Sequence, residues 1–237
     1  MLLLDLANPT RFLTLVQRAL PWLIGATAVA FTAGLYLAAN APDDYQQGAT
    51  VKIMFVHVPA AWLAMGIWTL MSIAALGTLV WRHPLADVAA KAAVPVGAAF
   101  TLICLVTGML WGRPMWGAYW VWDARLTSVL ILFLMYLGLI ALWRTVDDPS
   151  RAGRAAAILT LVGAINLPII KFSVDWWNTL HQPASIMRLD APAIHPAILM
   201  PLLWMAGSFL LLFILLVLVR TETEIDRRRL EVADQAS

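Results

Sequence analysis

Six stretches of this chain are apolar over a length that can cross a lipid bilayer. A helical span needs about 20 mostly apolar residues, because the hydrocarbon core is about 30 Å thick. Only 13% of the residues are charged, roughly half the usual share in soluble domains. We therefore expect an all-α integral membrane protein, a bundle of six transmembrane helices forming a single domain over residues 1–237. The expected spans are residues 20–39, 58–80, 92–110, 126–143, 156–174 and 196–219.

The segments outside these spans are short and leave no room for a separate soluble domain. Residues 1–19 predict an amphipathic helix at the inner membrane surface, because Asn8 suits a helix cap, Pro9 suits the first turn, and apolar residues recur on one face. Residues 111–125 predict an outer loop, and residues 220–237 predict a basic cytoplasmic tail.

The distribution of Lys and Arg predicts the orientation, because loops rich in these residues stay cytoplasmic. Eleven of the 16 lie in the chain start, the even-numbered loops and the tail. Both termini are therefore predicted to be cytoplasmic, with the segments near 40–57, 111–125 and 175–195 outside. The five on the outer side are Lys52, Arg113, Arg125, Lys171 and Arg188.

Residues 111–125, WGRPMWGAYWVWDAR, are unusually rich in tryptophan. Tryptophan is common at membrane interfaces, since its ring is apolar and its N–H is polar, and an interfacial belt would explain two of the four. Four of them, with Asp123 and Arg125 directly behind, favour a binding platform for a large, flat, mostly apolar ligand with charged ends. The platform residues are Trp111, Trp116, Trp120 and Trp122.

Two of the four histidines are candidates for metal binding at the outer face. His57 starts the second span, and His181 follows a Trp pair in the last outer segment; an imidazole at a lipid boundary is costly unless it has a role. His83 lies in a turn on the cytoplasmic side. His195 is outside, but it precedes the proline that begins the sixth span.

The outer ends of six bundled helices meet, so His57, His181 and the platform can share one site. Haem iron accepts an imidazole on each face, and aromatic rings suit the porphyrin. Asp123 can hold a tryptophan N–H or pair with an arginine. A closed zinc site needs four ligands and no aromatic floor, so haem is favoured, although either histidine alone can be structural. The cations that can pair with the haem propionates are Arg125, Arg113 and Lys52.

The single cysteine, two missing motifs and the net charge argue against several other functions. Cys104 is the only cysteine and is interpreted as a small buried hydrophobe. The chain has no Cys-x-x-Cys-His motif for thioether attachment of haem and no phosphate-binding Gly-rich loop, so a partner would hydrolyse any ATP. The net charge of +2 indicates no nucleic-acid partner. Asn166 and Pro168 weaken the fifth span; Asn166 fits either a helix–helix hydrogen bond or a cavity wall.

Three segments together resemble the haem exporter protein C family, the cytochrome c maturation protein C proteins. The pattern W-G-x-x-x-W-G-x-x-W-x-W-D-x-R-L-T begins at Trp111. H-V-P-A-A-W begins at His57, and W-W-N-T-L-H-Q begins at Trp176. The order of these motifs and the six-span layout also match, so the resemblance covers nearly the whole chain.

The resemblance implies a protein that holds haem at the periplasmic face of the bacterial inner membrane and passes it to a membrane-anchored haem chaperone. It implies His57 and His181 as axial ligands of haem b, with the four platform tryptophans and Asp123 around it. It also implies three partners besides the chaperone: an ATP-binding cassette ATPase, its membrane subunit and a small single-span membrane protein. The chain itself would not be an enzyme.

Two alternatives remain at this point. A transporter of a small cation or a quinone would need ionisable residues near mid-membrane, where the spans offer Cys104, Asn166 and little else. A structural subunit would use its tryptophans to grip a partner. An absorbance spectrum separates these alternatives, because only haem binding predicts a Soret band.

Overall fold

The structure, a computed structural model, describes residues 8–182, 186 and 191–236. In these residues the secondary structure is helical, and six helical segments are long and apolar enough to cross a membrane, which confirms the predicted class. The elements are α2 (Pro9–Ala39), the 3-10 helix η1 (Ala49–Ile53), α3 (Met54–Val80), α4 (Ala86–Trp116), α5 (Ala124–Thr145), α6 (Pro149–Gly163), α7 (Asn166–Trp176) and α8 (Pro196–Ala236).

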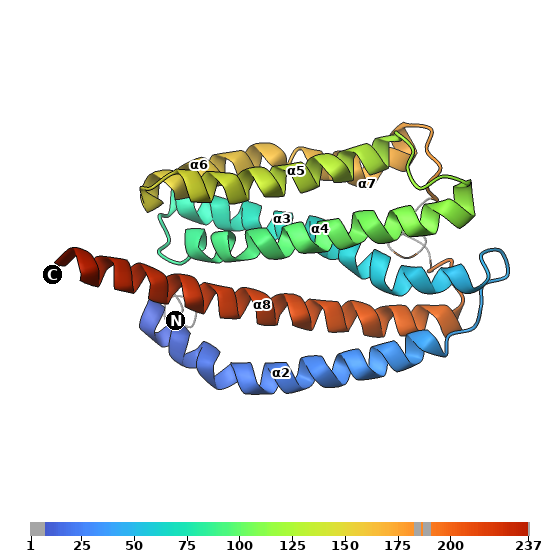
Figure 1. Cartoon of the computed structure of the whole chain (residues 1–237), viewed down its shortest axis with the longest axis horizontal. Helices are drawn as coiled ribbons and strands as arrows, with labels where there is room; N and C mark the ends of the chain where they lie inside the picture. The colour runs from blue at the N-terminus through green and yellow to red at the C-terminus, as the bar shows by residue number, and fades with distance from the viewer. Residues whose placement is uncertain (1–7, 183–185, 187–190, 237) are drawn as a thin grey trace.

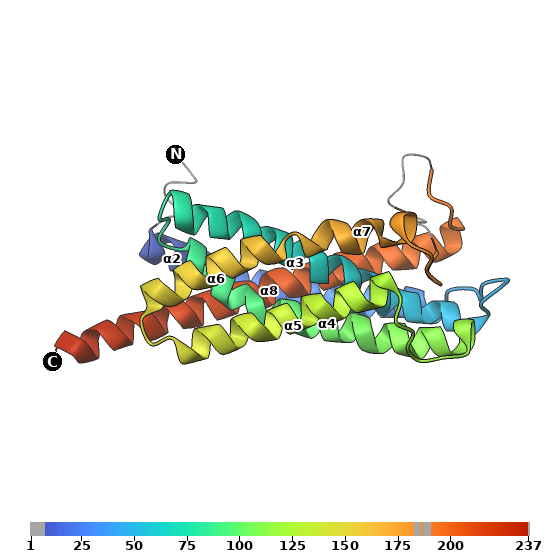
Figure 2. The same cartoon turned by 90° about the horizontal axis from the view of Figure 1, so that it is seen from above.

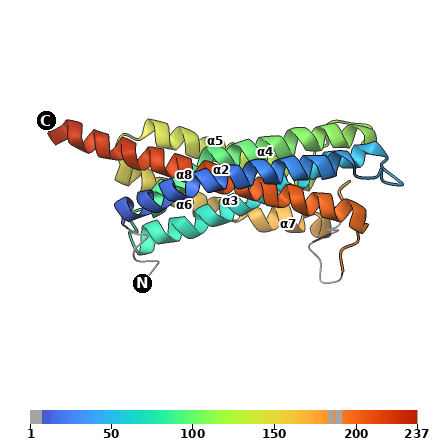
Figure 3. The same cartoon turned by 90° about the horizontal axis from the view of Figure 1, so that it is seen from below.

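The helices lie nearly parallel in an elongated bundle (Figure 1). α3 and α4 form its middle, where α3 packs on α4, α6 and α8. α5 covers one side together with α6 and α7, which follow each other along one line (Figure 2). α2 lies on the opposite side and packs mainly against α8 (Figure 3).

The bundle has two chemically different ends. The tryptophan end is formed by the α2–α3 and α4–α5 connections, by the described parts of the α7–α8 connection and by the helix ends beside them (Figure 1). The terminal end contains the start of α2, the end of α8 and the connections α3–α4 and α5–α6. This alternation agrees with the predicted sorting of the loops; Arg188, one of the cations used for that prediction, lies outside the described residues.

Small residues let the central helices approach closely. A Cβ on Gly97 would come within 2.3 Å of the Tyr136 ring, and one on Gly163 within 2.5 Å of Trp68. The Tyr136 hydroxyl donates to the Ala64 carbonyl at 2.9 Å, and the Trp68 and Tyr136 rings meet edge to face at 4.8 Å. Such small-residue contacts and interhelical hydrogen bonds are how helices associate in lipid.

The fifth span is built from two helices, α6 and α7, where one was predicted. The chain breaks between Gly163 and Asn166, and Pro168 in the next turn cannot donate a hydrogen bond to the carbonyl four residues earlier. The Asn166 amide, which is buried, donates to the Ser128 carbonyl of α5 at 2.8 Å. Of the two roles predicted for Asn166, the structure therefore shows the helix–helix hydrogen bond.

The start of α2, the end of α4 and the end of α8 also differ from the prediction. α2 is continuous through residue 39, so residues 9–19 form no separate helix; residues 1–7 lie outside the described part. The Asn8 side chain caps α2 as predicted, accepting from the N–H groups of Thr10 and Arg11. α4 extends to Trp116, so only residues 117–123 of the predicted loop connect the helices.

Each of these three helix bounds is explained by residues at or near it. Pro21 lies inside α2 without ending it. Gly117, with φ of 78°, provides the left-handed residue that ends α4. α8 continues through the predicted tail because pairs such as Arg227 with Glu231, four residues apart, favour a helix there.

Candidate functional site

His57 lies in the first turn of α3, and its hydrogen bonds determine which ring nitrogen has the proton. Its Nδ1 is 3.0 Å from the carbonyl oxygen of Cys104 and 3.1 Å from Thr107 Oγ1, both on α4. A carbonyl oxygen only accepts, so Nδ1 is the donor. In the neutral ring, Nε2 then has the lone pair that binds metals.

His181 has the same arrangement with a different partner. Its Nδ1 lies 2.9 Å from Asp123 Oδ2, and the other Asp123 oxygen accepts from the Leu126 N–H at 2.7 Å, capping α5. Burial lowers the pKa of the His181 imidazole, while Asp123 acts in the opposite direction. Burial alone would raise the pKa of Asp123, but the hydrogen bonds from Leu126 and His181 hold it below its usual value. A carboxylate therefore faces a neutral ring that has its proton on Nδ1 and its lone pair on Nε2.

The other two histidines use Nδ1 in the opposite sense. The N–H of Leu85 donates to His83 Nδ1 at 3.3 Å, and the N–H of Ala197 donates to His195 Nδ1 at 3.2 Å. An accepting Nδ1 places the proton of the neutral ring on Nε2. His83 and His195 therefore accept a backbone N–H at Nδ1, whereas His57 and His181 donate from Nδ1 and have the lone pair on Nε2.

Two platform tryptophans contact the two candidate ligands. The Trp116 ring meets His181 edge to face, with centroids 4.7 Å apart. The Trp111 ring meets His57 in the same way at 5.6 Å, and its N–H donates to the Gln47 side chain at 3.0 Å. Each imidazole therefore lies against one indole of α4, which positions both rings from one helix.

The remaining platform residues lie in the α4–α5 connection. The Trp120 and Trp122 rings meet edge to face at 5.4 Å. The Trp120 N–H is buried and has no hydrogen-bond partner among the described residues, while Trp122 is 76% exposed. A buried donor without an acceptor is costly, so Trp120 Nε1 is a candidate contact for a ligand oxygen.

Comparison with known proteins identifies the family. Its profile, described as heme exporter protein C, matches residues 2–236. The heme exporter protein C of Bradyrhizobium diazoefficiens is 72% identical over 229 residues, covering 97% of this chain and 87% of that protein. The Escherichia coli K12 protein of that name is 50% identical over 217 residues (91% and 87%), and the Paracoccus denitrificans protein is 46% identical over 227 (95% and 94%). This chain belongs to the heme exporter protein C family.

The three cations predicted to lie at the site have different environments. Arg125 Nε donates to Ser173 Oγ at 3.1 Å, and its charge acts on both His57 and His181. Arg113 donates to the Gly117 carbonyl, close to the end of its own helix. The structure therefore brings Arg125 into the region of the two histidines.

Lys52 and Arg113 make contacts that are local to loops. The Lys52 ammonium donates to the Ala39 carbonyl at 3.0 Å, at the end of α2, and lies 3.9 Å from Asp43 Oδ1. Arg113 also stacks over the Tyr119 ring at 5.7 Å. Both contacts stabilise the ends of helices, and the role of these two cations toward a ligand stays a prediction.

Sequence reasoning missed the residues that orient His57. Thr107 and Gly108 lie on α4, one turn beyond Cys104, and a Cβ on Gly108 would come 3.0 Å from His57 Cε1. Their spacing of three and four residues from Cys104 marks one helix face. That face can be read from the sequence, but its pairing with His57 on another helix cannot.

No group of three or more His, Cys, Asp or Glu side chains is placed to hold a bare metal ion in the described part of the chain. Haem iron already has four porphyrin nitrogens and needs at most two protein ligands. The two imidazoles that donate from Nδ1 are the candidate protein ligands for such an iron.

Proposed function

We propose that this protein binds haem b as its cargo at the tryptophan end, between His57 and His181, and passes it to a periplasmic haem chaperone during maturation of c-type cytochromes. The observation that supports this most directly is the shared orientation of the two imidazoles. Both use Nδ1 for a hydrogen bond to an acceptor, which leaves both Nε2 atoms available for iron.

The partners of these two rings suit metal ligands. Ligating histidines usually donate their second N–H to a carbonyl or a carboxylate, which fixes the tautomer and raises the basicity of the ligating nitrogen. His57 has the Cys104 carbonyl and His181 has the Asp123 carboxylate. His195, on the same end, has a backbone donor on Nδ1 and lacks this arrangement.

The aromatic and cationic residues complement the rest of a haem. Trp111 and Trp116, edge-on to the two imidazoles, would line the porphyrin beside its axial ligands. The Trp120 N–H would gain an acceptor in a propionate oxygen. Arg125 uses Nε on Ser173 and has further donors for a propionate, whereas Lys52 would act as a point charge.

Delivery is supported by the exposed tryptophans. Trp122 is 76% exposed, and Trp176 and Trp177 are 56% and 50% exposed at the same end. Large aromatic rings beside a ligand site suit contact with a protein that receives the ligand. We infer an inner-membrane protein with both termini cytoplasmic, working with an ATP-binding cassette ATPase, its membrane subunit and a small single-span protein, consistent with the word exporter in the names of its relatives.

The test is a titration of ferric haem into the purified protein, followed by absorbance and electron paramagnetic resonance. The wild type should give a six-coordinate, low-spin spectrum. His57→Ala and His181→Ala should each leave a five-coordinate or empty site, because one axial bond is lost. Loss of haem transfer to the purified chaperone should accompany either change.

His195→Ala and His83→Ala are the matched controls, because both rings accept a backbone N–H and should leave the spectrum unchanged. A low-spin spectrum that survives His181→Ala and collapses in His195→Ala would reassign the second ligand. Absence of any Soret band in the wild type would reject haem binding in favour of a structural or transport role.

A further inference from the structure

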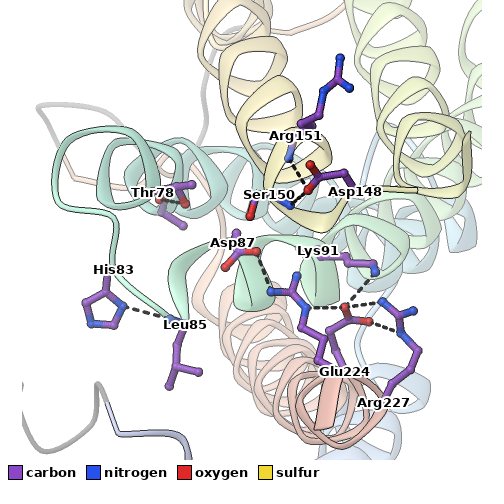
Figure 4. Close-up of polar contacts among 12 residues, drawn as sticks. Thr78, His83, Leu85, Asp87, Lys91, Asp148, Ser150, Arg151, Glu224 and Arg227 are labelled. Atoms are coloured by element: carbon purple, nitrogen blue, oxygen red, sulfur yellow. Dashed lines mark hydrogen bonds and ion pairs between the residues drawn. The ribbon is translucent and has the colours of Figure 1, made fainter. Parts of the chain in front are cut away.

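A second candidate site lies at the terminal end, between α4 and α8. A pocket there is lined by Lys91, Ala92, Arg220, Thr223 and Glu224. The apolar sequence of α8 ends at residue 219, so the pocket lies where the helix leaves the hydrocarbon region. Figure 4 shows Lys91 of α4 and Glu224 of α8 meeting in this region.

Glu224 is the carboxylate of the pocket, and cations surround it. Lys91 Nζ lies 2.8 Å from its Oε1, Arg228 Nε lies 2.9 Å from the same oxygen, and Arg227 donates to both oxygens at 2.7 and 3.0 Å (Figure 4 labels Lys91, Glu224 and Arg227). One carboxylate held by three cations presents no net negative charge to the pocket.

Arg220 is the fourth cation and is held differently. Its Nε donates to the Ala92 carbonyl at 3.1 Å, which orients the guanidinium across the gap between the helices. Asp87 pairs with Arg228 and Glu231 pairs with Arg227, the two arginines that also bind Glu224. Among the described residues, no carboxylate forms an ion pair with Arg220. The terminal nitrogens of its planar fork are suited to an anion with two or more oxygens.

Lys91 can contribute from the opposite helix. An ammonium group has three donors, and one of them goes to Glu224. The Trp143 ring lies 5.0 Å from Nζ and helps to hold the group in place. Thr223 lines the pocket from α8, as Arg220 does, and its hydroxyl donates to the Val219 carbonyl of the same helix.

We propose that this pocket binds the phosphate group of an anionic phospholipid, with Arg220 and Lys91 as its principal contacts. Free phosphate has the same chemistry, but the pocket lies at headgroup depth, where basic clefts between membrane helices meet lipid phosphates. The bound lipid would join α4 to α8 beside the ionic cluster. The site is separate from the haem site and does not depend on it.

The experiment is native mass spectrometry of the full-length protein in detergent, with phosphatidylglycerol or phosphatidylcholine of matched acyl chains. The wild type should retain phosphatidylglycerol about tenfold more strongly, and Arg220→Gln should abolish that preference. Arg220→Lys should keep part of this preference, because the positive charge remains while the planar guanidinium is lost. Thr223→Val changes the lining of the pocket beside Arg220 without changing its charge. Equal retention of both lipids by the wild type would overturn the proposal.

Arg144→Gln is the control, since Arg144 is exposed at the same end, in the last turn of α5, and does not line the pocket. An equal loss in Arg144→Gln and Arg220→Gln would show that general positive charge attracts the lipid and would reject a specific site. A parallel measurement with added inorganic phosphate distinguishes a lipid phosphate from free phosphate as the bound group. If phosphate alone displaces the lipid from the wild type, the lipid assignment fails.

Discussion

The two ends of the bundle use carboxylates in opposite ways. At the terminal end, Glu224 is shared among Lys91, Arg227 and Arg228, so charges neutralise one another within the protein. At the tryptophan end, Asp123 faces the ring of His181, which donates to the carboxylate from Nδ1 and has its lone pair on Nε2. The Glu224 cluster therefore joins α4 to α8 by ion pairs, whereas the Asp123–His181 pair has the arrangement that the proposed haem ligand requires.

A pair of helix caps shows the same contrast. Asp148 caps α6 at the terminal end, where Oδ1 accepts from the N–H groups of Ser150 and Arg151 (Figure 4). Asp123 caps α5 with Oδ1 and gives Oδ2 to His181. Two residues with the same local role therefore differ only in what the second oxygen does, which offers a direct test.

The largest effect on stability is expected from Glu224→Gln. The change leaves three cations around a neutral, nearly buried group, and breaking a buried ion pair costs about 3 kcal/mol or more. Chemical unfolding in detergent should show a lower free energy of unfolding, while the folded fraction binds haem as the wild type does. Glu231→Gln, on an exposed partner of Arg227, should cost less than about 1 kcal/mol. Weakened haem affinity without lost stability would contradict the division between the two ends.

Hydropathy and charge were sufficient to predict the six spans and the sorting of loops, because lipid imposes a length and a polarity on each helix. Local signals also placed the Asn8 cap. The break between α6 and α7 was indicated only as weakness around Asn166 and Pro168. The extension of α4 to Trp116 was missed, because Trp and Gly patterns alone do not show where a left-handed residue ends a helix.

The candidate ligands were found from residue type and topology, but their orientation was not predictable. His57 is fixed by a carbonyl 47 residues away, and His181 by a carboxylate 58 residues away. Asp123 was assigned to a tryptophan N–H or an arginine, whereas the structure pairs it with His181. Such contacts depend on how helices pack, and a main-chain carbonyl has no residue type to mark it.

A smaller effect is expected from Asp123→Asn, which sharpens the comparison of the caps. Asn is as good a cap as Asp, so the fold should be retained. The charged acceptor for His181 is lost, and changes of this kind typically weaken metal binding about 10- to 100-fold. Haem titration measures the affinity, with Asp148→Asn as the control that should have no effect. Wild-type affinity in Asp123→Asn would mean that Asp123 is a cap and nothing more.

The smallest effect is expected from Gly108→Ala, which tests whether space for the His57 ring is part of the site. Alanine favours a helix over glycine by about 0.5–1 kcal/mol, so stability should not fall. The added Cβ would lie 3.0 Å from His57 Cε1 and 3.5 Å from Nδ1, which crowds the ring away from its hydrogen bond with Cys104. Haem affinity should therefore weaken moderately, and the electron paramagnetic resonance signal of the low-spin iron should shift as the imidazole plane turns. Gly138→Ala in α5 is the control, because a Cβ added there has no atom within 4 Å. It should change neither the haem affinity nor the electron paramagnetic resonance signal. If the two variants behave alike, the close approach of α4 to His57 does not orient the ligand.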